Sequence, residues 1–375
     1  MSNIVLIVGA GLSGAVLAER FANDGAKVIV IDKRNHIGGN IYDYLNEDGL
    51  RVGKYGAHIY HDSDEETWEY VNRFSKWKPY EHRVVSNVDG QLVPIPINID
   101  TVNTLLGTKI KTEDDMNRWL ELQKSRIDIK NPKNSYESAI SRIGNEELYN
   151  KMIKFYTFKQ WGVYPEKLEA SVLDRIPVRN NYYNRYFSDK YEAIPENGYT
   201  KLVENMLNHE NITVYLGIDY HKGKDLEIFE KVDKIFFTGK IDTYFNNKYG
   251  KLEYRSLRFE HETHDTESYQ PAAVVNYPGT EVPFTRIVEH KKLYGQTHHK
   301  TLITKEYSQN EGEPYYPFPN KKNRKIYEKY QKEAEKLEKN GIYFVGRLAS
   351  YKYINMNQAV KMALDLHRRI KNGLC

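Results

Sequence analysis

Three glycines near the start of the chain are spaced for binding a dinucleotide. The apolar run 4–8 leads into Gly9, Gly11 and Gly14, and Asp32 ends a second apolar run after a predicted helix. Gly9 allows a tight turn, Gly11 lets the backbone approach a pyrophosphate, and Gly14 lets the helix lie against the sheet. The N–H groups of the first helical turn then face the anion. Asp32 is expected to accept hydrogen bonds from the ribose hydroxyls. The alternative is a glycine-rich turn without a ligand, but the complete strand–helix–strand frame favours a nucleotide site.

A second glycine pair follows the acid and favours one cofactor over another. Lys33 comes directly after Asp32, and the stretch 38–40 reads Gly-Gly-Asn. These glycines let the backbone approach the cofactor near its middle, which a diffusing NAD does not require. The stretch resembles that of flavoprotein oxidases and reductases, although taken alone it is also compatible with a simple turn. Near the other end, the apolar run 342–345 precedes Gly346 and a predicted helix, and resembles a C-terminal flavin-binding element. Together these segments favour FAD.

The composition excludes several functional classes. The 375 residues contain 55 basic and 51 acidic side chains, and the net charge of +4 gives no general case for nucleic acid or an anionic membrane. The one cysteine, Cys375, excludes an intrachain disulfide and fits a reducing cytoplasm. No apolar run approaches the length of a membrane span. His58 and His61 are too few for a metal site, so none is predicted.

The strand–helix–strand pattern around these residues indicates an α/β fold. The chain is longer than one hydrophobic core ordinarily accommodates, so more than one domain is expected. Apolar residues recur at helical spacing between 99 and 170, whereas short apolar runs separated by turns follow between 254 and 307. We predict a Rossmann-like FAD-binding domain from 1–77, 196–243 and 317–375, an inserted helical bundle over 99–170, and an antiparallel β-sheet domain from 78–98, 171–195 and 244–316.

Further segments carry a family resemblance, which extends from residue 4 to residue 363. These segments are 54–61, 158–162, 175–179, 186–191, 198–202 and 252–257. With them, the chain closely resembles bacterial UDP-galactopyranose mutases. The resemblance implies an FAD enzyme that interconverts UDP-galactopyranose and UDP-galactofuranose without net redox change, as a homodimer.

In that family N5 of the reduced flavin attacks the anomeric carbon and UDP leaves. The sugar ring then opens and recloses through another hydroxyl before UDP returns, so the protein supplies binding, orientation and electrostatics. The sequence has no second GxGxxG fingerprint, and a reductant such as NAD(P)H is therefore expected to bind without a dedicated domain. With the resemblance included, the residues expected at the cofactor are Gly9, Gly11, Ser13, Gly14, Asp32, Lys33, Gly39, Asn40, His58, His61, Gly346, Arg347, Asn355 and Met356.

The resemblance also implies which side chains bind the substrate. Arg175 and Arg286 are expected nearest the diphosphate, because a guanidinium binds phosphate oxygens bidentately. Arg347 is expected beside both flavin and substrate, and these three arginines form the predicted catalytic set. Tyr156 is expected to stack on uracil, and Trp161 to close over the sugar as part of a mobile loop. The alternative for each residue is a surface ion pair or a core aromatic. The other expected substrate residues are Thr157, Tyr186, Arg255, Glu306, Tyr316 and Tyr353.

Two positions depart from the family pattern and leave details of the substrate open. Asn355 replaces a common aspartate, and Ser350 stands where several relatives carry an acid, so this side of the site is less negative. UDP-N-acetylgalactosamine is an alternative substrate, although a histidine near position 61 is what the galactose-specific members usually show. A flavin oxidase or desaturase, and a nucleotide-binding sensor without chemistry, are the alternatives to an isomerase.

Overall fold

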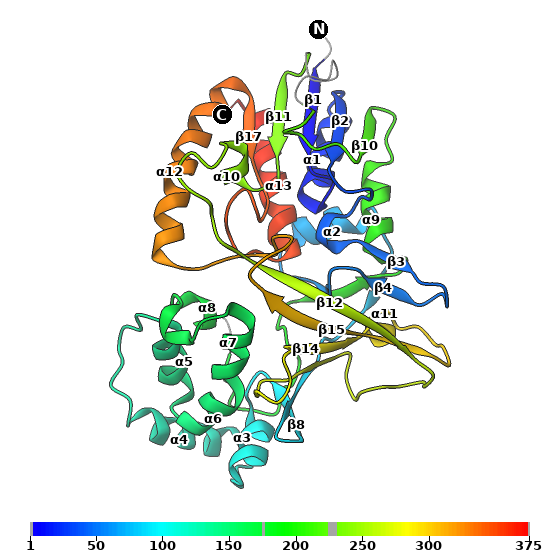
Figure 1. Ribbon diagram of the computed structural model, residues 1–375. Helices are drawn as coiled ribbons and strands as arrows, with labels where there is room; N and C mark the ends of the chain where they lie inside the picture. Colours follow the sequence, from blue (N-terminus) through cyan, green and yellow to red (C-terminus); the bar gives the residue numbers. More distant parts are fainter. Residues whose placement is uncertain (1–2, 175–176, 224–230, 374–375) are drawn as a thin grey trace.

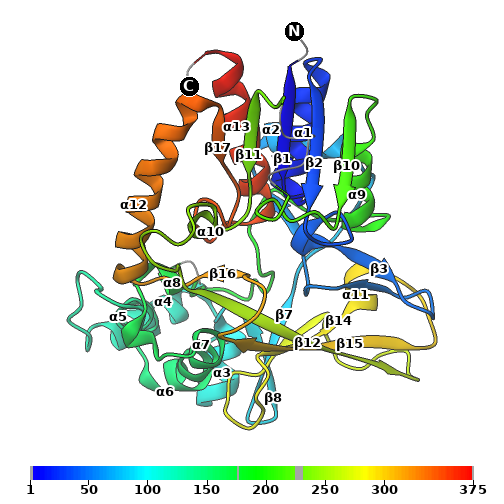
Figure 2. The ribbon, with the colours of Figure 1, turned by 45° about the horizontal axis from the view of Figure 1, so that its top comes forward.

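The nucleotide-binding part is built on a parallel five-stranded sheet with the order β10-β2-β1-β11-β17. The computed structural model describes residues 3–174, 177–223 and 231–373, and Figure 2 shows the five strands side by side. The strands come from three separate stretches of the chain. Their apolar runs are nearly continuous because helices cover both faces of such a sheet. The strands are β1 (Ile4–Val8), β2 (Lys27–Asp32), β10 (Ile212–Leu216), β11 (Lys234–Phe237) and β17 (Ile342–Phe344).

Helix α1 (Leu12–Asn23) is the central helix of this part, and it packs between α9 (Gly198–Leu207) and α13 (Met356–Lys371). Its apolar residues share one buried cluster with β1, α9 and α13. Helix α12 (Lys321–Leu337) packs on β17 and belongs to a separate apolar cluster with α10 (Ile241–Tyr244). The sheet is therefore covered on both faces, as expected for the fold class.

A second sheet has seven strands, in the order β16-β12-β15-β14-β13-β7-β8. Its long strands β12 and β15 pair from Ser256 opposite Gln309 to His264 opposite Thr301, and they run across the middle of Figure 1. The sequence predicted an antiparallel sheet, and one pair differs, because β13 runs parallel to β7. The strands are β7 (Val84–Val88), β8 (Gln91–Ile95), β12 (Tyr254–His264), β13 (Val274–Asn276), β14 (Arg286–Glu289), β15 (Thr301–Gln309) and β16 (Tyr316–Pro317).

The segment predicted as a helical bundle is helical, and it lies at the lower left of Figure 1, away from the parallel sheet. Its apolar side chains form one buried cluster with residues of β7 and β8. A π-helical turn at Asn150–Lys154 precedes α7, and a 3₁₀ turn at Pro165–Lys167 follows it. The helices are α3 (Ile99–Leu106), α4 (Glu113–Lys124), α5 (Ser135–Ile143), α6 (Glu146–Tyr149) and α7 (Phe155–Trp161), and α8 (Ser171–Asp174) follows just beyond the predicted limit at residue 170 and packs on α5.

Small elements complete the fold between these parts. In the described ranges no helix is long and apolar enough to cross a bilayer. The limits of the FAD-binding, helical and β-sheet domains given above remain our proposal for how the chain divides. The remaining elements are the 3₁₀ turns Gly39–Ile41 and Glu338–Asn340, strands β3 (Asp43–Leu45), β4 (Arg51–Gly53), β5 (Tyr60–Asp62), β6 (Trp77–Pro79) and β9 (Tyr191–Pro195), and helices α2 (Glu65–Asn72) and α11 (His290–Tyr294).

Candidate active site

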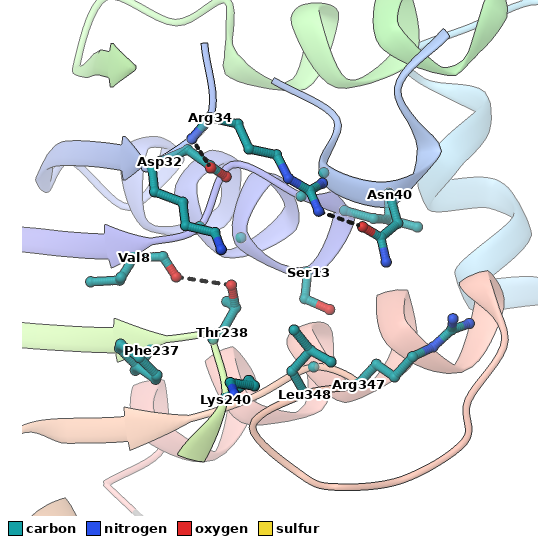
Figure 3. Close-up of a pocket in the computed structure, with 18 of the residues that line it drawn as sticks. Val8, Ser13, Asp32, Arg34, Asn40, Phe237, Thr238, Lys240, Arg347 and Leu348 are labelled. Carbon is teal, nitrogen blue, oxygen red and sulfur yellow. Dashed lines mark hydrogen bonds between the residues drawn. The ribbon is translucent and has the colours of Figure 1, made fainter. Parts of the chain in front are cut away.

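A cavity of about 380 Å³ opens at the carboxyl ends of the parallel strands, where ligands bind in folds of this kind (Figure 3). His61 is the one residue of the predicted cofactor set that does not line it. The others all do, although they come from opposite ends of the chain. They are Gly9, Gly11, Ser13, Gly14, Asp32, Lys33, Gly39, Asn40, His58, Gly346, Arg347, Asn355 and Met356.

Two glycine loops meet at this cavity and leave room for a backbone approach. A Cβ atom on Gly39 would lie 2.9 Å from Cα of Gly11, so a side chain at position 39 would collide with the first glycine loop. Gly11 is also the N-cap of α1, and it offers no side-chain hydrogen bond to the first N–H groups of the helix. Those N–H groups require acceptors, and a pyrophosphate supplies them. The cavity therefore fits a dinucleotide cofactor.

Asp32 is fixed at the end of β2 by two backbone donors. Its Oδ2 accepts from the amide of Ala10 and its Oδ1 accepts from the amide of Arg34, both at 2.9 Å. Each carboxylate oxygen keeps a further lone pair, which suits the ribose hydroxyls. The Arg34 guanidinium in turn donates to Oδ1 of Asn40 at 3.0 Å (Figure 3).

The sequence analysis missed part of this cavity. Glu313 lines it and accepts from Lys33 at 3.0 Å and from Arg34 at 3.2 Å, so a loop before β16 contacts the end of β2. No local pattern marks such an ion pair, since its partners are far apart in the chain. Other lining residues outside the predicted set are Arg34, Ile218, Asp219, Tyr220, His221, Thr238, Lys240 and Leu348.

His58 and Arg347 lie where this cavity approaches the predicted substrate residues. The imidazole Nδ1 of His58 donates to the carbonyl of Gly56 at 3.1 Å. Burial, with added repulsion from Arg347 and Arg286, lowers the pKa of His58 to about 4. The ring is therefore neutral at pH 7, and its Nε2 is an acceptor.

We expect His58 not to titrate in the working range of the protein. With a pKa of about 4, roughly one molecule in a thousand carries the charge at pH 7. In flavin-bound protein labelled with ¹⁵N-histidine, the His58 resonances should stay constant from pH 6 to pH 9. A midpoint near 6.5 for His58 would contradict this assignment.

Arg347 connects the cavity with a cluster of tyrosines. Its Nε and Nη2 donate to the carbonyl of Ile354 at 3.2 and 2.5 Å, which orients the guanidinium. The guanidinium lies 5.7 Å from the ring centre of Tyr316 and 5.5 Å from that of Tyr353. These two rings are stacked at 5.2 Å. Three of the predicted residues are thereby brought together at the edge of the cofactor cavity.

Arg286 and Glu306 form the charged centre of the same cluster. Nε of Arg286 donates to Oε2 of Glu306 at 2.6 Å. Burial opposes the charged form of Arg286, but Glu306 outweighs it and raises the pKa of the guanidinium. Oε1 of Glu306 is buried and has no hydrogen-bond partner among the described residues, so it suits a donor that this chain does not supply. Burial raises the pKa of the adjacent Tyr156 to about 12, and this phenol interacts electrostatically with Tyr186.

Four predicted residues lie elsewhere or have other contacts. Arg175 is outside the described residues. His61 stacks on Phe187 at 3.7 Å and contacts Asp189 at 2.8 Å instead of lining the cofactor cavity. Thr157 is buried within α7. The Arg255 guanidinium is 3% exposed and donates to the carbonyl of Gln160 at 2.9 Å and to other groups of the protein. These contacts hold the end of α7, and the predicted contact of Arg255 with substrate stays a prediction.

Trp161 also differs from its predicted place in a loop. It is the last residue of α7 and is 5% exposed, with its ring 6.0 Å from Phe318 and 6.4 Å from Tyr316. The helix ends there because Gly162 adopts a positive φ of 72°, which terminates helices readily. A loop following Trp161 can therefore move only from Gly162 onward without breaking the helix.

We expect nucleotide binding to change the surroundings of Trp161, because closure would exclude water from the sugar site. UDP should quench or shift the tryptophan emission of the flavin-bound protein. Trp68, Trp77 and Trp119 also emit, and Trp161→Phe is the control. An equal change in that variant, or a loop that stays in one place in structures with and without UDP, would exclude such a lid.

The two departures from the family pattern have local explanations. Asn355 is the N-cap of α13, and its backbone N–H donates to Oε1 of Gln358 at 2.9 Å. Asparagine and aspartate are about equally favourable at an N-cap, so the structural part of the position is retained. Ser350 donates its hydroxyl to the carbonyl of Gly346 at 2.8 Å. Among the described residues no group of three or more metal-ligating side chains is found.

Comparisons with known proteins agree with this geometry. Residues 151–353 match the family model for UDP-galactopyranose mutase, and residues 7–74 match that for an NAD(P)-binding Rossmann-like domain. The chain is 38% identical to a dTDP-fucopyranose mutase of Escherichia coli, over 97% of each chain. It is 40% identical to a probable UDP-galactopyranose mutase of Klebsiella pneumoniae, over 96% of this chain and 92% of the relative. A reduced UDP-galactopyranose mutase crystal structure superposes with a TM-score of 0.79 at 18% identity, covering all of this chain and 96% of the other.

The fold and the cavity define a flavoprotein of the Rossmann-like α/β class. Within that class, the chain belongs to the UDP-galactopyranose mutase family. It is accordingly an isomerase with FAD as its cofactor, and the predictions of family, fold class and cofactor are confirmed.

Proposed function

We propose that this protein interconverts UDP-galactopyranose and UDP-galactofuranose. The observation that carries the proposal is the position of Arg347, which lines the cofactor cavity and also lies over the rings of Tyr316 and Tyr353. A sugar bound beside these tyrosines is therefore close to the cofactor. Arg286 and Glu306 adjoin the same tyrosines and offer both a cation and a buried acceptor.

The chain's own residues perform binding and charge stabilisation in this scheme. When bound and reduced, the flavin supplies an electron-rich N5 for the anomeric carbon. Arg286 stays protonated at every working pH, since its pKa is raised, and it stabilises the negative charge that grows on the departing diphosphate. Arg347 orients sugar and diphosphate beside the cavity. The phenol of Tyr156 stays protonated and its ring suits a nucleobase.

Several further assignments belong to the proposal and depend on the family resemblance. Arg175 provides a second cation for the diphosphate, and Trp161 covers the sugar. NAD(P)H reduces the flavin without a domain of its own, the active form is a homodimer, and the enzyme works in the cytoplasm.

A second candidate substrate is dTDP-fucopyranose, because the Escherichia coli relative with that printed name is 38% identical over 97% of this chain. UDP-N-acetylgalactosamine remains the third. These sugars differ in their hydroxyl, methyl or acetamido groups, and the two bases differ by one methyl group. All three sugars are attached to a diphosphate, so the diphosphate arginines do not choose among them.

One experiment separates the candidates. The flavin-bound protein, reduced with dithionite, is incubated with UDP-galactopyranose, dTDP-fucopyranose and UDP-N-acetylgalactosamine in parallel, and furanose products are measured by chromatography and NMR. We expect the highest kcat/KM with UDP-galactopyranose, without stoichiometric use of reductant, and no turnover by fully oxidised protein. A higher kcat/KM for dTDP-fucopyranose would transfer the assignment to that sugar, and turnover by oxidised protein would exclude the mechanism.

A further inference from the structure

Lys159, in the last turn of α7, joins this helix to a distant hairpin loop. Its Nζ donates to the backbone carbonyls of Val282 at 3.2 Å and Phe284 at 3.0 Å, and also to that of Tyr277. All three acceptors belong to the connection between β13 and β14, more than a hundred residues further along the chain. Three converging carbonyls match the three N–H donors of an ammonium group.

The hairpin loop leads directly to the charged centre of the site. Its base is closed by the amide of Tyr277, which donates to the carbonyl of Thr285 at 2.9 Å. The amide and hydroxyl of Thr285 donate to the carbonyl of Glu306, at 2.8 and 3.1 Å. Arg286 follows as the first residue of β14. A displacement of this loop would therefore move Arg286 and Glu306.

The end of α7 is held from a second side by Arg255 of β12. Its guanidinium donates to the carbonyl of Gln160 at 2.9 Å, and Ser308 of β15 donates to the same carbonyl. Lys159 and Arg255 thus fix consecutive residues of the final helical turn against two different parts of the seven-stranded sheet. Trp161 comes immediately afterward, and it packs on Phe318 and Tyr316.

We propose that Lys159 is a positioning residue, which holds the end of α7 and Trp161 in register with Arg286 so that both sides of the nucleotide-sugar site stay together. The inference rests on the proposed function for its choice of substrate. Lys159 does not touch the reacting atoms in this scheme. Lys159 influences the affinity for the nucleotide sugar through the hairpin loop that positions Arg286. Its effect should therefore appear mainly in KM.

The protonation state of Lys159 gives the proposal a distinctive signature. Burial lowers the pKa of Lys159 to about 8, against the opposing charge of Glu281 in the hairpin loop. The Tyr277 carbonyl of the same loop accepts from Lys159 Nζ, and the Arg255 guanidinium of β12 donates to the backbone carbonyl of Lys159 at 3.5 Å. The pKa of Lys159 is lower in this contact than in water, so the contact binds fewer protons than a solvated lysine does. Raising the pH through 8 should therefore not release the loop, and the wild-type KM should not rise above pH 8.

The test compares Lys159→Met, Lys159→Arg and the exposed control Lys167→Met in flavin-bound, reduced protein. We expect Lys159→Met to raise KM about tenfold while kcat falls less than about threefold, with FAD content and Tm unchanged. Amide hydrogen exchange, measured without nucleotide, should be faster in 158–162 and in 277–284. Lys159→Arg keeps a cation with several N–H donors and should give a KM close to that of wild type. Lys167→Met should behave as wild type.

The possible outcomes separate this inference from the proposed function. A wild-type protein without activity on any of the three sugars contradicts the proposed function, and the hydrogen-exchange comparison still tests Lys159. Unchanged exchange in both segments would overturn the inference, as would a KM for Lys159→Met within twofold of wild type. If Lys159→Met does not fold, Lys159→Gln is measured in its place, and unchanged exchange or a KM within twofold of wild type in that variant would overturn the inference equally.

Discussion

Replacing Arg286 by alanine is expected to lower kcat/KM by about two to three orders of magnitude, because charge-assisted contacts to a developing anion contribute about 2 to 4 kcal/mol in a dry site. FAD content should stay normal, since Arg286 does not line the cofactor cavity. Steady-state rates with UDP-galactopyranose and the flavin-to-protein absorbance ratio measure the two effects separately.

The interpretation needs a control for the buried partner. Glu306 is 1% exposed, and removing Arg286 leaves its carboxylate unpaired, which is destabilising in itself. The double variant Arg286→Ala/Glu306→Gln removes that charge, and Arg258→Ala removes a surface arginine from the same sheet. Full activity in Arg286→Ala would mean that the diphosphate binds elsewhere. Recovery of the rate in the double variant would mean that the loss came from the unpaired carboxylate.

Replacing Gly14 by valine is expected to abolish FAD binding while other parts of the fold persist. A Cβ atom at this position would lie 2.0 Å from the carbonyl oxygen of Gly9 and 3.1 Å from Cγ2 of Ile7. The clashing atom of Gly9 is a backbone carbonyl oxygen, which cannot rotate away as a side chain does. The clash can therefore be relieved only by moving α1 away from β1. Such a movement withdraws the N–H groups at the start of α1 from the pyrophosphate.

The measurement is the flavin content of freshly purified protein, with far-UV circular dichroism as the check on folding. Ala22→Gly is the matched control, because it weakens the far end of the same helix by about 1 kcal/mol without a steric clash. We expect that control to keep its flavin. Normal flavin content in Gly14→Val would show that α1 can shift without losing the cofactor, contrary to this account.

The nucleotide-binding half was predictable because its chemistry depends on local spacing. The turn at Gly9, the helix after Gly11 and the acid at Asp32 lie within one strand–helix–strand unit, and β1 has the bounds expected from its apolar run. The helix after Gly346 was likewise predictable from its apolar period, and α13 (Met356–Lys371) contains the predicted positions Val360, Met362, Ala363 and Leu366. Each of these features is fixed by neighbours in the chain.

Features that depend on distant partners were not predictable in the same way. The ion pairs of Glu313, the commitment of Arg255 to the end of α7 and the parallel pairing of β13 with β7 all join remote segments. The motif around Trp161 predicts a loop. In the structure Trp161 is the last residue of α7, and Gly162, with its positive φ, is the residue that ends the helix. A pattern within a short window contains no information on which distant carbonyl or carboxylate will be its partner.

The division of the parallel sheet among three stretches of chain has a consequence for biosynthesis. Gly346 and Met356 face the same cavity as Gly9, so more than three hundred residues are synthesised between the two walls of the cofactor site. At translation rates of about 5 to 20 residues per second, the first wall waits on the order of tens of seconds for the second. During that interval the nascent chain has no complete binding site. Capture of the cofactor must therefore be a late event, and a chain released early is left with an exposed sheet edge.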